Sequence, residues 1–163
     1  MYKMILSLVA ALGFVGTAQA SEVAYPTETE INYTLLSHVG GGEQVYYNCD
    51  SVEDTVESML KKLGAENISV RCTGGLDQDW RFPTPANVSA RFIAASSVKN
   101  NQAPRKASVQ NVVLRDNGSC HLYKETLETL EVAMELEIVK APGACRADSR
   151  IRSNFQVNVL AFE

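Results

Sequence analysis

An apolar stripe at helical spacing is the strongest pattern along the chain, and it lies between residues 52 and 63. Asp50 or Ser51 is the expected N-terminal cap, because an acidic side chain follows three positions after each of them. Gly64 is the expected end, since glycine readily adopts the left-handed conformation that terminates many helices. The pattern predicts a helix whose buried face carries Val52, Val56, Met59, Leu60 and Leu63.

Apolar and polar positions alternate on both sides of this helix, which is typical of strands with one buried face. The alternation covers residues 45–49 before the helix, and residues 68–72 and 87–95 after it. A first unit is therefore predicted to run strand, helix, strand, strand over residues 43–95. Residues 21–42 are interpreted as a lead-in of mostly exposed coil that adds at most one further strand.

The same plan recurs after a polar seam at residues 96–106. The shift that carries Cys49 onto Cys120 also carries the apolar stripe of the first helix onto apolar residues of a second. The second unit, residues 107–163, is therefore also predicted to run strand, helix, strand, strand. Its strands are expected at residues 109–114, from Val132 onward, and at residues 155–162.

The four cysteines occupy matching places in the two units. In a strand–helix–strand crossover the two strands are parallel, so their C-terminal ends lie at the same edge of the sheet. Cys49 ends the first predicted strand and Cys72 the next, and Cys120 and Cys145 have the same relation, so the predicted disulfides are Cys49–Cys72 and Cys120–Cys145. Each bond is expected to stabilise the fold by roughly 3 kcal/mol through loop closure. The two other pairings of four cysteines stay open at this point.

Residues 1–20 have the composition of a secretory signal peptide. Lys3 supplies a basic start, residues 4–15 are almost wholly apolar, and Ala18 and Ala20 form a small-residue cleavage site. The apolar run is too short for a stable membrane-spanning helix. The expected location is the periplasm or the exterior of the cell, where an even number of cysteines forms disulfides.

The predicted fold class is α+β. We expect two tandem β-α-β-β units that form a two-layer sandwich, with the helices on one face of a single antiparallel or mixed sheet. Residues 43–163 are expected to form one domain that contains both units. The net charge of −4 disfavours nucleic acid as a partner. The cysteine spacing lacks the short pairs typical of zinc sites, so no metal and no cofactor are predicted.

Polar residues of the predicted strands are expected to line the sheet face that the helices leave open. Arg71 and Arg91 are the candidate binding residues on that face. A solvated face and a binding surface remain alternative interpretations. The full predicted face consists of Ser69, Arg71, Ser89, Arg91, Glu135, Glu137, Gln156 and Asn158.

A loop that contains the only tryptophan of the chain is the second candidate for recognition. Trp80, Arg81 and Phe82 stand between predicted strands and are followed by two prolines. Aromatic residues and arginine are enriched at interfaces. The alternative is that Trp80 and Phe82 close one end of the core, since large aromatic side chains are usually mostly buried.

Catalytic arrangements are weak in this sequence, and no catalytic residue is predicted. Cys120 lies next to His121, but neighbouring residues point in different directions on a helix and Cys120 is expected in a disulfide. Glu135 and Glu137 share a predicted strand face, where solvation is the simpler interpretation.

These patterns lead to the hypothesis of an exported, non-catalytic protein that binds another macromolecule of the envelope or the secreted fraction. An assembly accessory and an enzyme inhibitor both fit that description, and the expected partner is another protein or a second copy of the chain. A small envelope hydrolase and a carrier of a small ligand are the alternatives.

Overall fold

The computed structural model describes residues 22–35, 38–39, 43–44, 46–76, 84–116, 118–143, 145 and 152–163. The two helices in these ranges are α1 (Cys49–Lys62) and α2 (Cys120–Ala133). The main sheet consists of β1 (Glu22–Leu35), β4 (Glu66–Gly75), β5 (Thr84–Ser96), β6 (Arg105–Arg115), β7 (Glu137–Lys140) and β8 (Asn154–Phe162). Two short strands, β2 (His38–Val39) and β3 (Glu43–Gln44), pair with each other.

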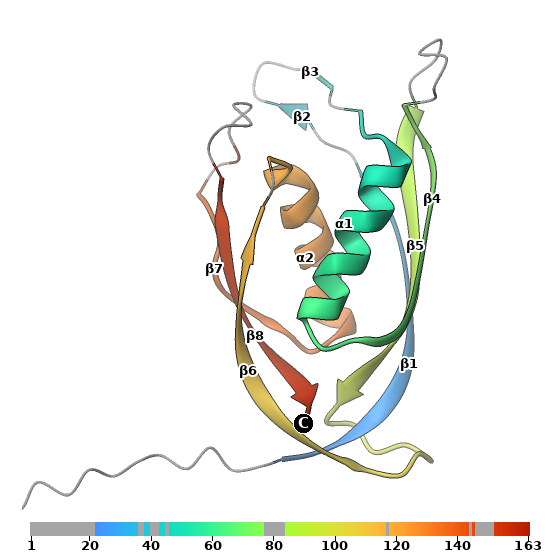
Figure 1. Ribbon diagram of the computed structural model, residues 1–163, viewed down its shortest axis with the longest axis vertical. Coiled ribbons are helices and arrows are strands. Elements are labelled where there is room, and N and C mark those ends of the chain that lie inside the picture. The colour runs from blue at the N-terminus through green and yellow to red at the C-terminus, as the bar shows by residue number, and fades with distance from the viewer. Residues whose placement is uncertain are drawn as a thin grey trace, which may run out of the picture.

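The main sheet has six strands in the order β4-β5-β1-β6-β8-β7, and all of its pairings are antiparallel. It bends strongly, and α1 and α2 lie inside the bend (Figure 1). The prediction of an α+β fold with two helices on a single antiparallel sheet is confirmed.

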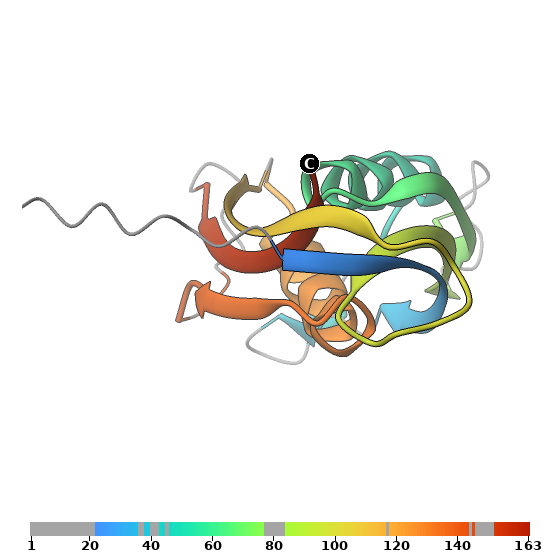
Figure 2. The same cartoon turned by 90° about the horizontal axis from the view of Figure 1, so that it is seen from below.

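The long strand β1 joins two halves of this sheet. It pairs with β5 from Tyr25 to Leu35, but with β6 only from Glu22 to Ala24. Beyond that short contact the halves diverge around the helices, and Figure 2 shows β1 and β6 side by side where they meet. The first half consists of β1, α1, β4 and β5, and the second half of β6, α2, β7 and β8.

The strand that opens the first half is not the predicted one. Residues 46–48 have no regular structure and Cys49 begins α1, so the strand expected at residues 45–49 is wrong. The opening strand is β1, within the predicted lead-in. Pro26 is tolerated there because its carbonyl accepts a hydrogen bond from the Asn100 side chain, which places its missing N–H on the side of β1 away from β5.

The strand expected from Val132 onward is also wrong at its start. The helix α2 continues to Ala133, and the Val132 side chain is 87% exposed on its outer side. Met134 and Leu136 are buried in the connection to β7. Tyr123, Leu127, Leu130 and Met134 follow helical spacing, so this stripe, and not the alternation, governs the segment.

The core lies between the bent sheet and the helices. Phe92 of β5, Met59 of α1, Leu127 of α2 and Phe155 of β8 are among its fully buried side chains. A smaller cluster lies where the halves meet, and it consists mainly of short side chains that allow close approach of the strands. Its members are Ala24, Ala95, Ala107 and Leu160, with Phe162 packed against them.

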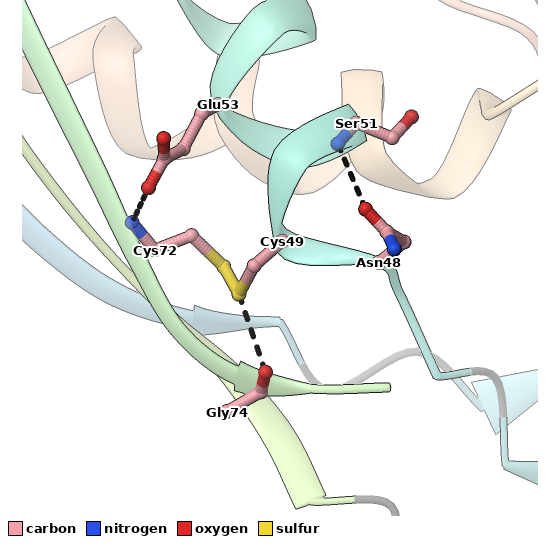
Figure 3. The surroundings of a disulfide bond; sticks show 6 residues. All are labelled: Asn48, Cys49, Ser51, Glu53, Cys72 and Gly74. Atoms are coloured by element: carbon pink, nitrogen blue, oxygen red, sulfur yellow. Dashed lines mark hydrogen bonds between the residues drawn. A yellow bond between two sulfur atoms is a disulfide. The ribbon is translucent and has the colours of Figure 1, made fainter. Parts of the chain in front are cut away.

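Both predicted disulfides are confirmed. Cys49–Cys72 joins the start of α1 to β4, with the Cα atoms 5.3 Å apart (Figure 3). Cys120–Cys145 joins the start of α2 to the segment after β7, with the Cα atoms 5.5 Å apart. The strands β1 and β4 do run parallel, since both are antiparallel to the strand β5 between them. Cys49 differs from the prediction in that it begins the helix and does not end a strand.

Candidate functional site

The convex side of the first half carries the polar residues of three neighbouring strands. Ile31, Val88 and Phe92 point into the core, so the residues that alternate with them point outward. We call this surface the outer polar face. It consists of Glu28, Glu30, Asn32 and Thr34 of β1, Asn87, Ser89 and Arg91 of β5, and Ser69, Arg71 and Thr73 of β4.

A hollow of about 270 Å³ lies within this face, lined by Ser69, Arg71, Ser89 and Arg91. The strand register explains the grouping. Ser69 is directly opposite Arg91, and Arg71 is directly opposite Ser89. The two arginines therefore occupy diagonal positions on adjacent strands, at a separation that long side chains can bridge.

One carboxylate, that of Glu30, forms an ion pair with one of these two arginines. The Arg91 Nε donates to Glu30 Oε2 at 3.0 Å, and the Asn32 side chain donates to Glu30 Oε1 at 3.4 Å. The hydrogen bond from Arg91, followed by that from Asn32, holds the pKa of Glu30 below its ordinary value. Glu30 thus stays ionised at neutral pH and neutralises one of the two guanidinium groups.

The other polar side chains that line the hollow make no hydrogen bonds or ion pairs with the described part of the chain. Arg71, Ser69 and Ser89 make no side-chain hydrogen bond to any residue that the structure describes, and Arg71 makes no ion pair there. Glu30 pairs with Arg91, so the guanidinium of Arg71 is the charge in the hollow that has no ion pair among the described residues. The free donors of the hollow are a guanidinium and two hydroxyl groups.

The outer face of the second half differs in this respect. Its amide side chains bond to one another: Asn111 donates to Asn158 at 2.8 Å and Gln156 donates to Asn111 at 2.8 Å. Asn158 in turn donates to the Glu137 carboxylate at 3.1 Å. This ladder satisfies its own polar groups, so the hollow of the first half is the better candidate for a ligand.

The structure brings together part of the predicted surface. Arg71 and Arg91 share the hollow as expected. Glu135 does not share a strand face with Glu137, because it lies in the turn after α2 with φ of 50° and accepts hydrogen bonds from Ser96 and Ser97. The prediction missed Glu30, although its alternation with Ile31 is a strand signal in the sequence.

Two other sequence candidates have different outcomes. Trp80, Arg81 and Phe82 lie outside the described residues, so the recognition loop stays a prediction. Cys120 is held in a disulfide and so has no thiolate to act with His121. In the described part of the chain no cluster of three metal-ligating side chains occurs.

A second hollow, of about 360 Å³, lies between β1 and α2. Tyr33 lines it, and its hydroxyl is 2.8 Å from the Thr126 hydroxyl in a hydrogen bond between the two halves. Burial raises the pKa of Tyr33 to about 12. The acidic residues Glu125 and Glu128 stand at its mouth, so it is a weaker candidate, because a group of carboxylates alone does not define a ligand.

Comparisons with known proteins give no relative. No protein-family model matches the chain, and neither the curated proteins nor the solved structures contain a match. No helix in the described ranges is long and apolar enough to cross a membrane.

Proposed function

We propose that this is an exported, non-catalytic protein that binds another macromolecule through its outer polar face. The observation that carries the proposal is the hollow in which Arg71, Ser69 and Ser89 have no partner among the described residues. Charge-assisted hydrogen bonds are among the stronger polar contacts, and these donors are available for them.

Binding is favoured over catalysis by the surroundings of the two hydroxyl groups. Nucleophilic serine needs a base within hydrogen-bond distance. Neither Ser69 nor Ser89 has a hydrogen-bonded histidine or carboxylate in the described part of the chain. The lining of the hollow is also polar, whereas small-molecule sites are mostly apolar.

Export to the periplasm or the cell exterior belongs to this proposal. Two disulfides support it, since such bonds persist mainly in oxidising compartments. The proposed signal peptide, residues 1–20, lies outside the described residues. Sequencing the N-terminus of the protein recovered outside the cytoplasm should give a chain that begins at Ser21.

A duplicated β-α-β-β unit is a further part of the proposal. In each half the strand order is first, third, second: β1-β5-β4 and β6-β8-β7. A helix follows the first strand in both halves, and a disulfide begins at the first residue of each helix. The amide side chains on the outer face of the second half bond to one another, which favours the first half as the binding surface.

The test is a capture experiment from native envelope and secreted fractions. The full chain, produced in an oxidising compartment, is immobilised beside the variants Arg71→Gln and Arg115→Gln. Arg115 is an exposed arginine at the end of β6 without an ion pair in the described residues, so its variant makes the same charge change elsewhere.

The proposal expects one macromolecule to be retained by the wild type and by R115Q, with at least a tenfold loss for R71Q. Circular dichroism checks that all three proteins are folded. Equal retention by the three proteins, or no retained macromolecule, contradicts the proposal.

A further inference from the structure

We propose that the hollow binds the anionic group of an acidic polysaccharide, such as the carboxylate of a uronic acid. This inference rests on the proposed function and specifies the ligand of the same site. Its basis is the charge, the size and the surroundings of the hollow.

The positive charge of the hollow favours the binding of an anion. Arg71 and Arg91 are diagonal neighbours, and among the described residues Glu30 alone forms an ion pair with either of them. Like charges at such positions repel each other unless an anion lies between them. The Arg91 side chain is 67% exposed and bonds to Glu30 through Nε, so its remaining guanidinium donors are available to a ligand beside those of Arg71.

The size of the hollow indicates a group on a longer chain. Its volume of about 270 Å³ lies just below the range of roughly 300–1,000 Å³ for sites that enclose a whole small molecule. The strands leave it open to the rest of the face. A single anionic substituent fits, while the polymer that carries it continues over the neighbouring strands.

The surroundings favour a polyhydroxylated chain over an acidic protein segment. The neighbours of the hollow are short hydroxyl and amide side chains, such as Asn32, Asn87 and Thr73. Stable protein interfaces bury an apolar, often aromatic, centre. None of the exposed large apolar side chains found in the described residues lies on this face; they are Val23, Val98, Val109, Val113, Val132 and Val139.

Isothermal titration of the full-length protein with polygalacturonate tests the inference. Neutral dextran, poly-glutamate of equal charge and inorganic phosphate are titrated in parallel, each with wild type, R71Q and R115Q. We expect polygalacturonate to bind wild type and R115Q within twofold of each other and R71Q at least tenfold more weakly. Dextran and phosphate alone should bind at least tenfold more weakly than polygalacturonate.

Three results overturn the inference: no binding of polygalacturonate, equal binding to R71Q and wild type, or equal or tighter binding of poly-glutamate. The first or third, together with an envelope capture that still depends on Arg71, removes only the polysaccharide and keeps the binding function. Loss of the Arg71 dependence in the capture experiment removes the proposed function as well.

Discussion

The side chain of Asn48 closes the N-terminal end of α1. Asn48 has an extended backbone, with φ −77° and ψ 125°, and its Oδ1 accepts a hydrogen bond from the Ser51 backbone N–H at 3.2 Å (Figure 3). The predicted caps, Asp50 and Ser51, lie inside the helix. Glu53 instead accepts the Cys72 backbone N–H at 2.6 Å, so its carboxylate ties α1 to the edge of β4.

Replacing Asn48 by alanine should lower the free energy of unfolding by about 1 kcal/mol, because the helix loses a cap. Ser51→Ala should change it by less than about 0.5 kcal/mol, since only the backbone of Ser51 takes part. Urea denaturation measures both. A Ser51→Ala cost equal to that of Asn48→Ala would show that the serine hydroxyl is the cap.

Each helix is fixed at its start by a disulfide, and α1 is also fixed at its end by a close approach to the other half. Gly64 has φ of +81°, and the Ala65 N–H bonds back to the Leu60 carbonyl at 3.0 Å, as in a glycine-terminated helix. A Cβ atom on Gly64 would lie 2.7 Å from the Cβ of Ala161 in β8. The end of α1 therefore rests against the second half.

Gly64→Ala should lower the free energy of unfolding by more than about 1 kcal/mol, because it adds both backbone strain and a clash. Gly143→Ala is the matched control, since its added Cβ has no neighbour within 4 Å among the residues that the structure describes. Its effect should stay within about 0.5 kcal/mol. Equal effects of the two substitutions in denaturant titrations would contradict the contact between α1 and β8.

Polar contacts hold the two halves together around the shared strand β1. Arg105 at the start of β6 donates twice to the Glu66 carboxylate, with both distances 2.8 Å, and stacks over the Phe162 ring. Glu135 accepts hydrogen bonds from the hydroxyl groups of Ser96 and Ser97 at 2.7 Å each. Both contacts link the two halves through a carboxylate, that of Glu66 in the first half and that of Glu135 in the second, so their strength depends on pH.

The pKa of Glu66 is lowered by hydrogen bonds from Arg105, and the pKa of Glu135 by those from Ser97 and then Ser96. A carboxyl whose pKa is lower in the folded state stabilises the fold above its ordinary pKa near 4.5, and this contribution is lost as the pH falls through the folded-state value. The free energy of unfolding should therefore decrease below about pH 4.5.

A double-mutant cycle with Glu66→Gln and Arg105→Gln measures the coupling free energy between the two residues. The four proteins are unfolded with denaturant at pH 7 and at pH 3. Coupling between the two residues should be favourable at pH 7 and weaker at pH 3, because protonation of Glu66 becomes more favourable as the pH falls and removes the ion pair. Coupling that is unchanged between the two pH values would contradict the assignment.

Only some of the residues of the candidate site could be predicted from patterns in the sequence. Alternation along β4 and β5 places Arg71 and Arg91 on the same face, because side chains in a strand alternate between its two sides. The hollow and the Glu30–Arg91 pair depend on which strands are neighbours and in what register, and these are non-local choices. The role of the Trp80 loop stays a prediction.

The sequence by itself determined the first helix and the alternation of β5, since both follow from local periodicity. It favoured the observed pairing of the four cysteines but left the two other pairings open. Only the tertiary structure decided that β1 is the strand shared by both halves and that α2 extends to Ala133. Residues 22–35 contain a proline and charged side chains, and they become a strand because β5 supplies hydrogen bonds along one edge and the core buries Ile31 and Leu35. Such partners lie far away in the chain, so local patterns cannot specify them.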